Sequence, residues 1–250
     1  MKIIFAMAGA SSRFLNAGYK SPKYILPLWK KTVFYYAVNG FARYFNKSEF
    51  IFVYRDLYGT KDFINAQCRA LGLAEFQAIE LPHLTQGQAQ SVYEALCALN
   101  LPDNESVLIF NIDTFRLDFA LPTIFDLGKI DGYLEVFRGV GDQWSFVLPK
   151  EANLGKGHLY QVAQTAEKRR ISPLCSSGLY YFRQCSDFKA VFESMLKNSD
   201  KTKGEYYIAP MYNALIAQGK DIRYCEILPS EVLFCGTPQE YENLKSKENK

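Results

Sequence analysis

Short apolar segments alternate with helix-like segments through the first 112 residues, and this alternation constrains the fold more than any other feature. The pattern predicts strands over residues 2–8, 49–54, 76–81 and 106–112, and helices over 32–44, 61–71 and 88–99. Strands joined through helices lie parallel in one sheet, and the helices cover both of its faces. We therefore predict an α/β fold in which ligands bind at the carboxyl ends of the strands.

The second half of the chain is less regular. Its pattern predicts strands over 132–137, 144–148, 160–164 and 178–182, and helices over 186–197, 205–218 and 238–247. No linker, internal repeat or low-complexity region separates this half from the first. We therefore predict a single domain over residues 1–250, with one mixed, mostly parallel sheet that the second half completes.

Composition excludes several classes of protein. Hydrophobic residues make up 48% and charged residues 22%, so the chain can bury a core and is not predominantly disordered. The net charge of +3, from 29 basic and 26 acidic residues, gives no reason to expect nucleic-acid binding. No apolar run approaches the ~20 residues that span a bilayer, so we expect no membrane partner. The apolar start is too short for a secretory signal, which favours a cytoplasmic protein.

The cysteines and histidines point to neither a disulfide framework nor a zinc site. The six cysteines are scattered without a Cys-x-x-Cys pair, which is typical of buried thiols in a reducing compartment. His83 and His158 are the two histidines, too few for a His-rich metal site. Aromatic residues are abundant at 15%, and the pairs Tyr180-Tyr181 and Tyr206-Tyr207 are candidates for lining a pocket.

Small residues follow the first predicted strand directly: Ala8, Gly9, Ala10, Ser11 and Ser12. Small side chains let the backbone approach a ligand closely, and successive N–H groups can bind phosphate oxygens. Arg13 and Lys23 follow in the same loop and add the positive charge that phosphoryl transfer requires. The loop is neither a Walker A motif nor a Gly-x-Gly-x-x-Gly fingerprint. The alternative is a plain strand-to-helix turn with solvated basic residues.

Later segments add chemistry of the same kind. Asp113 follows the fourth predicted strand, where a carboxylate is suited to Mg²⁺ shared with phosphate oxygens, or simply caps a helix. Glu167 and Lys168 are either site residues or a surface charge pair. The remaining segments of interest are Thr85-Gln86-Gly87-Gln88-Ala89, Gly204-Glu205-Tyr206-Tyr207 and Gly236-Thr237-Pro238.

In their order and spacing, these segments resemble the nucleotidyltransferases that make activated sugars and alcohols. That family combines Ala-Ala-Gly-x-Gly-Ser-Arg-Phe and Pro-Lys near its start with Thr-x-Gly-x-Ala, a strand-end aspartate, Glu-Lys and Gly-Thr-Pro. The resemblance runs from Lys2 to about Tyr241. It implies a Rossmann-like three-layer fold of the nucleotide-diphospho-sugar transferase type, with residues 1–118 binding nucleotide and residues 119–250 binding the acceptor.

The resemblance also implies roles for single residues. Arg13, Lys23 and Lys168 would be catalytic, and Asp113 would hold Mg²⁺. The nucleotide would bind at Ala8, Gly9, Ala10, Ser11, Ser12, Thr85, Gln86 and Gly87. The acceptor would bind at Glu167, Gly178, Glu205 and Tyr206.

Three positions depart from the family pattern. Met7 replaces an alanine, and Ser11 replaces a glycine, which a tight loop tolerates if φ at Ser11 stays negative. Phe234 stands where many relatives carry a second metal-binding aspartate, two residues before Gly-Thr-Pro. The metal would then be held by Asp113 alone with waters and nucleotide oxygens, or also by another carboxylate such as Glu205.

Within the family, the sequence is most similar to the cytidylyltransferases that act on L-glutamine phosphate in capsule modification. The expected partners are CTP, or another pyrimidine nucleotide, and a phosphorylated small molecule, with a sugar 1-phosphate as the second choice. Two other classes stay open: a metal-dependent glycosyltransferase, for which Asn111-Ile112-Asp113 supplies half of the usual Asp-x-Asp, and a non-catalytic nucleotide sensor. A homo-oligomer is also open.

Overall fold

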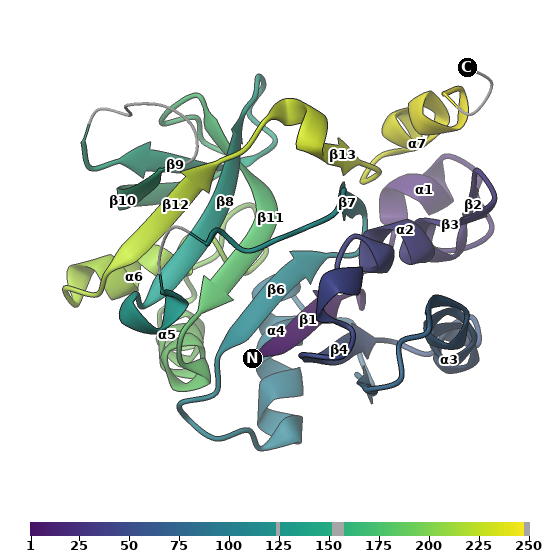
Figure 1. The fold of residues 1–250 in the computed structure, drawn as a ribbon, viewed down its shortest axis with the longest axis horizontal. Coiled ribbons are helices and arrows are strands. Elements are labelled where there is room, and N and C mark those ends of the chain that lie inside the picture. Colours follow the sequence, from purple (N-terminus) through teal and green to yellow (C-terminus); the bar gives the residue numbers. More distant parts are fainter. Residues whose placement is uncertain (124–125, 152–157, 248–250) are drawn as a thin grey trace.

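A computed structural model describes residues 1–123, 126–151 and 158–247 of the chain (Figure 1). Its helices are α1 (Ser12–Asn16), α2 (Val33–Asn39), α3 (Thr60–Leu71), α4 (Gln88–Leu99), α5 (Cys185–Asn198), α6 (Met211–Ala217) and α7 (Pro238–Lys245). A nine-stranded sheet crosses the described residues in the order β5-β4-β1-β6-β11-β8-β12-β10-β9. The prediction of one α/β sheet built by both halves is confirmed.

The first half supplies four parallel strands: β1 (Lys2–Ala6), β4 (Glu49–Tyr54), β5 (Phe76–Glu80) and β6 (Val107–Asn111). Successive side chains of a strand point to opposite faces. Thus Ile3 and Phe5 enter one core with residues of α2 and α3, while Ile4 enters a second core with residues of α4, α5 and α6. Helices therefore cover both faces of the sheet, as the alternation predicted.

The second half supplies β8 (Gly132–Arg138), β9 (Ser145–Pro149), β10 (Leu159–Glu167), β11 (Leu174–Phe182) and β12 (Ile222–Glu226). These five strands curl so that β9 pairs with β11 as well as with β10, which closes a small barrel. The prediction of a mostly parallel sheet is wrong here, because most pairings in this half are antiparallel. Among the described residues, strands β8 to β11 follow one another without a helix between them, and such connections favour antiparallel neighbours.

Two helix boundaries differ from the prediction for local reasons. Helix α2 ends at Asn39, and the carbonyl of the next residue, Gly40, accepts from the Phe119 N–H at 2.9 Å. Glycine is required there because a Cβ atom would lie 2.1 Å from the Arg116 carbonyl oxygen. Helix α6 begins at Met211 because the preceding segment extends toward the start of α4, where the Tyr206 N–H donates to the Gln86 carbonyl at 2.7 Å.

The periodicity also missed several short strands, which are β2 (Pro27–Leu28), β3 (Lys31–Thr32), β7 (Thr114–Arg116), β12 and β13 (Val232–Phe234). Strand β13 pairs with β7, so the last part of the chain lies beside the segment that follows Asp113. Helix α7 then returns to α1 at the opposite end of the sequence (Figure 1), where the rings of Tyr241 and Phe14 lie 6.1 Å apart.

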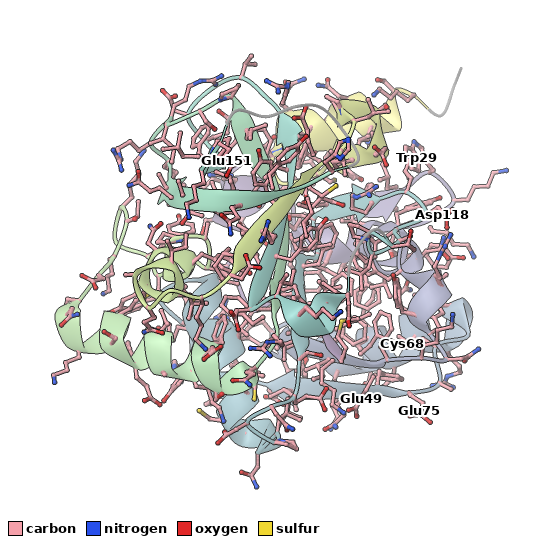
Figure 2. The ribbon with its side chains drawn as sticks, turned by 60° about the vertical axis from the view of Figure 1, so that its left-hand side comes forward. Trp29, Glu49, Cys68, Glu75, Asp118 and Glu151 are labelled. Atoms are coloured by element: carbon pink, nitrogen blue, oxygen red, sulfur yellow. The ribbon has the colours of Figure 1, made fainter. Side chains whose placement is uncertain are left out.

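The cysteines are free thiols in the described residues, and all except Cys97 are buried. Cys68 on α3 lies among the closely packed side chains of the first core (Figure 2). This agrees with the prediction of buried thiols. Among the described helices, none is both long and apolar enough to cross a membrane.

Candidate active site

Two adjoining cavities lie at the carboxyl ends of β1 and β6. The first has a volume of about 480 Å³ and is lined mainly by the loop after β1 and the start of α4. The second has a volume of about 350 Å³ and is lined mainly by residues of the barrel. Both are lined by Arg13, Gln88, Asn111, Asp113, Glu205 and Gly236. A ligand in one cavity therefore lies next to a ligand in the other.

The loop after β1 forms one wall of the first cavity, with Ala8, Gly9, Ala10, Ser11 and Ser12 all lining it. The expectation of a negative φ at Ser11 is wrong, because Ser11 has φ 50° and ψ 30°. A residue in this left-handed conformation turns successive N–H groups toward one side, as an anion-binding nest requires. The Ser11 hydroxyl accepts a hydrogen bond from the Lys23 N–H at 3.4 Å, which ties the two ends of the loop together.

Lys23 and Asp113 form an ion pair between the first loop and the end of β6, with Nζ 2.5 Å from Oδ2. The backbone of Asp113 is fixed by the Cys235 N–H, which donates to its carbonyl at 2.8 Å. Gly236 leaves room for the carboxylate, since a Cβ atom there would lie 3.0 Å from Oδ2. Arg13 is exposed on α1 and lines both cavities.

The donor set around Asp113 fits a magnesium ion that is held largely by its substrates. In the described parts of the chain, no three Asp, Glu, His or Cys side chains gather as a metal cluster. Phe234 instead packs its ring 4.7 Å from that of Trp144. Mg²⁺ commonly takes one or two carboxylates and completes its shell with water and phosphate oxygens. Asp113 meets that requirement, and Glu205 lines the same cavities.

The loop before α4 is joined to the segment that precedes α6. Thr85 and Gly87 line the first cavity, whereas Gln86 does not. The side chain of Gln86 instead accepts a hydrogen bond from Lys201 at 2.5 Å. Gly87 has φ 130° and touches the backbone of Tyr206, where a Cβ atom would lie 2.4 Å from the carbonyl oxygen. A larger residue at position 87 would push these two segments apart.

Three of the four residues predicted to bind the acceptor, Glu167, Gly178 and Glu205, line the second cavity, as does Lys168, which was predicted to be catalytic. Tyr206 lines neither cavity, and its ring is buried 5.4 Å from that of Phe192. Its neighbour Tyr207 lines the second cavity instead. Gly178 has φ 90° and makes space for Asn111, since a Cβ atom would lie 2.2 Å from Nδ2.

Glu167 and Lys168 stand side by side at the end of β10 but lie in different surroundings. The Glu167 side chain is buried and accepts a hydrogen bond from the Ser145 hydroxyl. Burial raises the pKa of the Glu167 carboxyl, although the Ser145 hydrogen bond and Lys168 oppose this shift. Lys168 donates to the Tyr207 hydroxyl and lies 4.3 Å from the centre of its ring.

The prediction of site residues omitted several side chains that line the second cavity, among them Asn111, Gln88, Trp144, Ser145, Tyr180 and Tyr207. Gln88 donates to Asn111 at 2.7 Å and so joins the start of α4 to the end of β6. The aromatic pairs carried part of this signal, because one member of each, Tyr180 and Tyr207, lines the cavity. Trp144 and Ser145 come to the cavity only through the closure of the barrel.

Comparison with solved structures places these features in context. A nucleoside-diphosphate-sugar pyrophosphorylase from Vibrio cholerae RC9 is 42% identical, with a TM-score of 0.88 over 98% of this chain and 100% of that one. An inositol-1-phosphate CTP transferase from T. maritima is 16% identical, with a TM-score of 0.72 over 100% and 96% of the two chains. A UDP-glucose pyrophosphorylase in complex with UDP-glucose is 15% identical, with a TM-score of 0.73 over 99% and 98%.

No protein-family model matches the chain. No curated protein matches it either. The two structures below 25% identity show a shared fold, which is Rossmann-like α/β with a central mixed sheet. The Vibrio cholerae protein matches along nearly the whole of both chains, and its 42% identity shows that the two proteins are homologous. On that relationship, this chain belongs to the nucleoside-diphosphate-sugar pyrophosphorylase family and is a nucleotidyltransferase.

Proposed function

We propose that the protein transfers CMP from CTP to the phosphate of a small metabolite and releases diphosphate. The observation that carries the proposal is the pair of adjoining cavities that share Arg13 and Asp113. Residues 1–118 would hold the nucleotide and residues 119–250 the acceptor, within one domain. We place the reaction in the cytoplasm, where nucleoside triphosphates are available.

In the first cavity, the backbone of Ala8–Ser12 would bind the triphosphate. Arg13 presents a planar fork that can bind two phosphate oxygens, whereas Lys23 supplies a point charge. The loop that contains Thr85, Gln86 and Gly87 would contact the base through Thr85 and Gly87, because Gln86 does not line the cavity and its side chain turns to Lys201. Asp113 would be the protein's ligand to Mg²⁺, which when bound would neutralise charge on the phosphates.

In the second cavity, Lys168 would bind the acceptor phosphate, and Glu167, Glu205 and the Gly178 backbone would bind the rest of the acceptor. An oxygen of that phosphate attacks the α-phosphorus of CTP, a new P–O bond forms, and the bond to the diphosphate oxygen breaks. The attacking phosphate is already anionic, so no general base is needed. The protein contributes position and positive charge through Arg13, Lys23 and Lys168.

Two acceptors are supported by different observations. L-glutamine phosphate is favoured by the sequence resemblance, together with CTP as the nucleotide and a role in capsule modification. A sugar 1-phosphate is favoured by the 42% identity to the protein described as a nucleoside-diphosphate-sugar pyrophosphorylase. Both fit the same reaction.

A panel of nucleotides and acceptors tests the proposal. Each of CTP, UTP, dTTP and ATP is mixed with L-glutamine phosphate or a sugar 1-phosphate in Mg²⁺, and diphosphate release is measured. We expect the fastest release with CTP and L-glutamine phosphate. Faster release with UTP or dTTP and a sugar phosphate would reject the cytidylyl assignment. Nucleotide binding without release for every acceptor would indicate a nucleotide sensor.

A further inference from the structure

We infer that Arg55 is a positioning residue for the nucleotide: its side chain fixes the peptide between Ala8 and Gly9 so that the Gly9 N–H faces the phosphates. The inference rests on the proposed function, in which the loop after β1 binds the triphosphate. Arg55 lines neither cavity, so it acts through this peptide and not by contact with the substrate.

Arg55 directly follows β4, and its side chain reaches the loop after β1. Its Nε donates to the Ala8 carbonyl at 2.8 Å. The backbone hydrogen bonds between β1 and β4 end just before this point, where the Met7 N–H donates to the Val53 carbonyl at 2.8 Å. The Arg55 side chain therefore adds one hydrogen bond beyond the last backbone bond, at the start of the loop.

The Ala8 carbonyl and the Gly9 N–H belong to the same peptide unit. Because this peptide is trans, the two groups point in opposite directions, and the N–H is turned away from Arg55. Gly9 lines the first cavity, and its N–H donates to no group among the described residues. The wall of the cavity therefore carries a free donor to which a phosphate oxygen can bind.

Glycine makes this peptide easy to turn over. A Cβ atom at Gly9 would meet nothing within 4 Å, so side-chain packing does not hold the residue. Glycine also adopts positive and negative φ about equally, so rotation beside the peptide meets little resistance. A peptide turned over would present the Ala8 carbonyl oxygen to the phosphates and repel them. The hydrogen bond from Arg55 opposes that rotation.

The loop that carries Arg55 is also fixed to the far end of the loop after β1. Asp56 accepts a hydrogen bond from the Thr60 N–H at 2.6 Å, at the start of α3. The Thr60 hydroxyl lies 3.0 Å from the Tyr24 hydroxyl, and Tyr24 lines the first cavity. Residues 55–60 thus contact both ends of the phosphate-binding loop, which holds Arg55 in place relative to it.

Two substitutions separate the hydrogen bond of Arg55 from its charge. Arg55→Gln removes the charge but places an amide N–H at the position of Nε, whereas Arg55→Met has a similar reach and no donor. For the nucleotide that the wild type uses fastest, we expect the KM to rise about tenfold in Arg55→Met, the effect of one lost contact. In Arg55→Gln it should stay within about threefold of the wild type. The KM for the acceptor should stay within about threefold in both.

Three results would overturn the inference. An unchanged nucleotide KM in Arg55→Met would show that the hydrogen bond is not needed. Equal rises in Arg55→Met and Arg55→Gln would assign the effect to charge. A rise in the KM of both substrates would indicate a general disturbance of the fold. Arg55→Ala, a second variant without a donor, should give the same tenfold rise as Arg55→Met.

Arg69→Met is the matched control. Arg69 is exposed on α3 and lines neither cavity, so its substitution should change neither KM. The nucleoside of the same base, which carries no phosphate, provides a second control as an inhibitor that competes with the nucleotide. Its inhibition constant should stay within about threefold in Arg55→Met. A tenfold rise would show that Arg55 serves the base, which would overturn the inference.

Calorimetric binding of the nucleotide without acceptor separates this inference from the proposed function. If no acceptor gives diphosphate release, the proposed function fails, yet a tenfold loss of nucleotide affinity in Arg55→Met would still support the inference. Diphosphate release by the wild type, with equal nucleotide affinity in the wild type and Arg55→Met, would overturn the inference alone. Neither binding nor release in the wild type would overturn both.

Discussion

The two cavities differ in the part of the chain that forms their walls. One wall of the first is formed by small residues, from one loop and the glycine before α4. The second is built by long side chains, including carboxylates and aromatic rings that come from several strands of the barrel. The first is suited to groups common to every nucleotide, namely the phosphates. In the proposed function, the second would discriminate among acceptors.

The largest effect on activity is expected from a substitution at the boundary between the two cavities. Asp113 lines both, and in the proposed function it would hold Mg²⁺ and so neutralise charge on the phosphates. Asp113→Asn should therefore lower kcat by at least ~100-fold, the low end of the effect of one electrostatic stabiliser. Steady-state diphosphate release in saturating Mg²⁺ measures this effect. Turnover near that of the wild type would remove Asp113 from the metal site.

Arg13→Lys tests whether the first cavity depends on the geometry of a cation as well as on its charge. The substitution keeps the charge and loses the two-pronged contact, so we expect kcat/KM to fall roughly 10–100-fold, about 1.4–2.7 kcal/mol. Arg43→Lys is the matched control, because Arg43 is half exposed and pairs with the surface residue Asp118. Equal kinetics in the two variants would mean that the first loop is only a turn.

Lys168→Ala tests whether the two cavities bind different substrates. Lys168 lines the second cavity and not the first, so the acceptor's KM should rise about tenfold while CTP affinity stays within about threefold, under ~1 kcal/mol. Calorimetry gives the CTP affinity, and diphosphate release gives the KM. A collapse of CTP binding would show that the division between nucleotide and acceptor residues is wrong.

The same contrast explains how much the sequence predicts. The first cavity was largely predictable, because Ala8–Ser12 and Asp113 follow strands whose apolar pattern is strong. The second was predictable only in part. Predicted residues such as Glu167 and Gly178 line it, but Trp144, Ser145 and Tyr180 meet only when β9 pairs with both β10 and β11. Such closure depends on long-range pairing, which leaves no periodic signal in a short strand. Tyr207 lines the cavity and Tyr206 does not, because the Tyr206 backbone is hydrogen-bonded to the backbone of Gln86 and Ala89.

Glu167→Gln tests whether the negative charge of the Glu167 carboxylate in the second cavity lowers the free energy of unfolding. Burial raises the pKa of Glu167 above its ordinary value of 4.5, so the folded state retains the proton more tightly than the unfolded state. Raising the pH through this range therefore lowers the wild-type free energy of unfolding. At pH 7.5 the variant should be more stable by about 1 kcal/mol, at the low end of the cost of a poorly paired buried polar group.

Thermal melts across pH measure this difference in the absence of substrates. About 1 kcal/mol corresponds to a Tm higher by roughly 2–4 °C, and the difference should shrink as the pH falls toward 4.5. A variant less stable than the wild type at pH 7.5 would show that the carboxylate is well satisfied without a ligand.

Ser11 offers the smallest and most local test, on the first cavity. An L residue in the left-handed region costs roughly 1–2 kcal/mol, whereas glycine adopts it freely but loses about 0.5–1 kcal/mol more backbone entropy on folding. Ser11→Gly should therefore raise stability by about 0.5 kcal/mol, less any contribution of the 3.4 Å bond to Lys23. Ser11→Ala keeps the unfavourable φ of 50° and removes the hydroxyl, so it should lower stability by about 0.5–1 kcal/mol.

Urea unfolding resolves both values, and CTP affinity should stay within about threefold in Ser11→Gly because the backbone nest is unchanged. Equal losses in the two variants would mean that the hydroxyl, and not the left-handed backbone, determines the conformation of the loop.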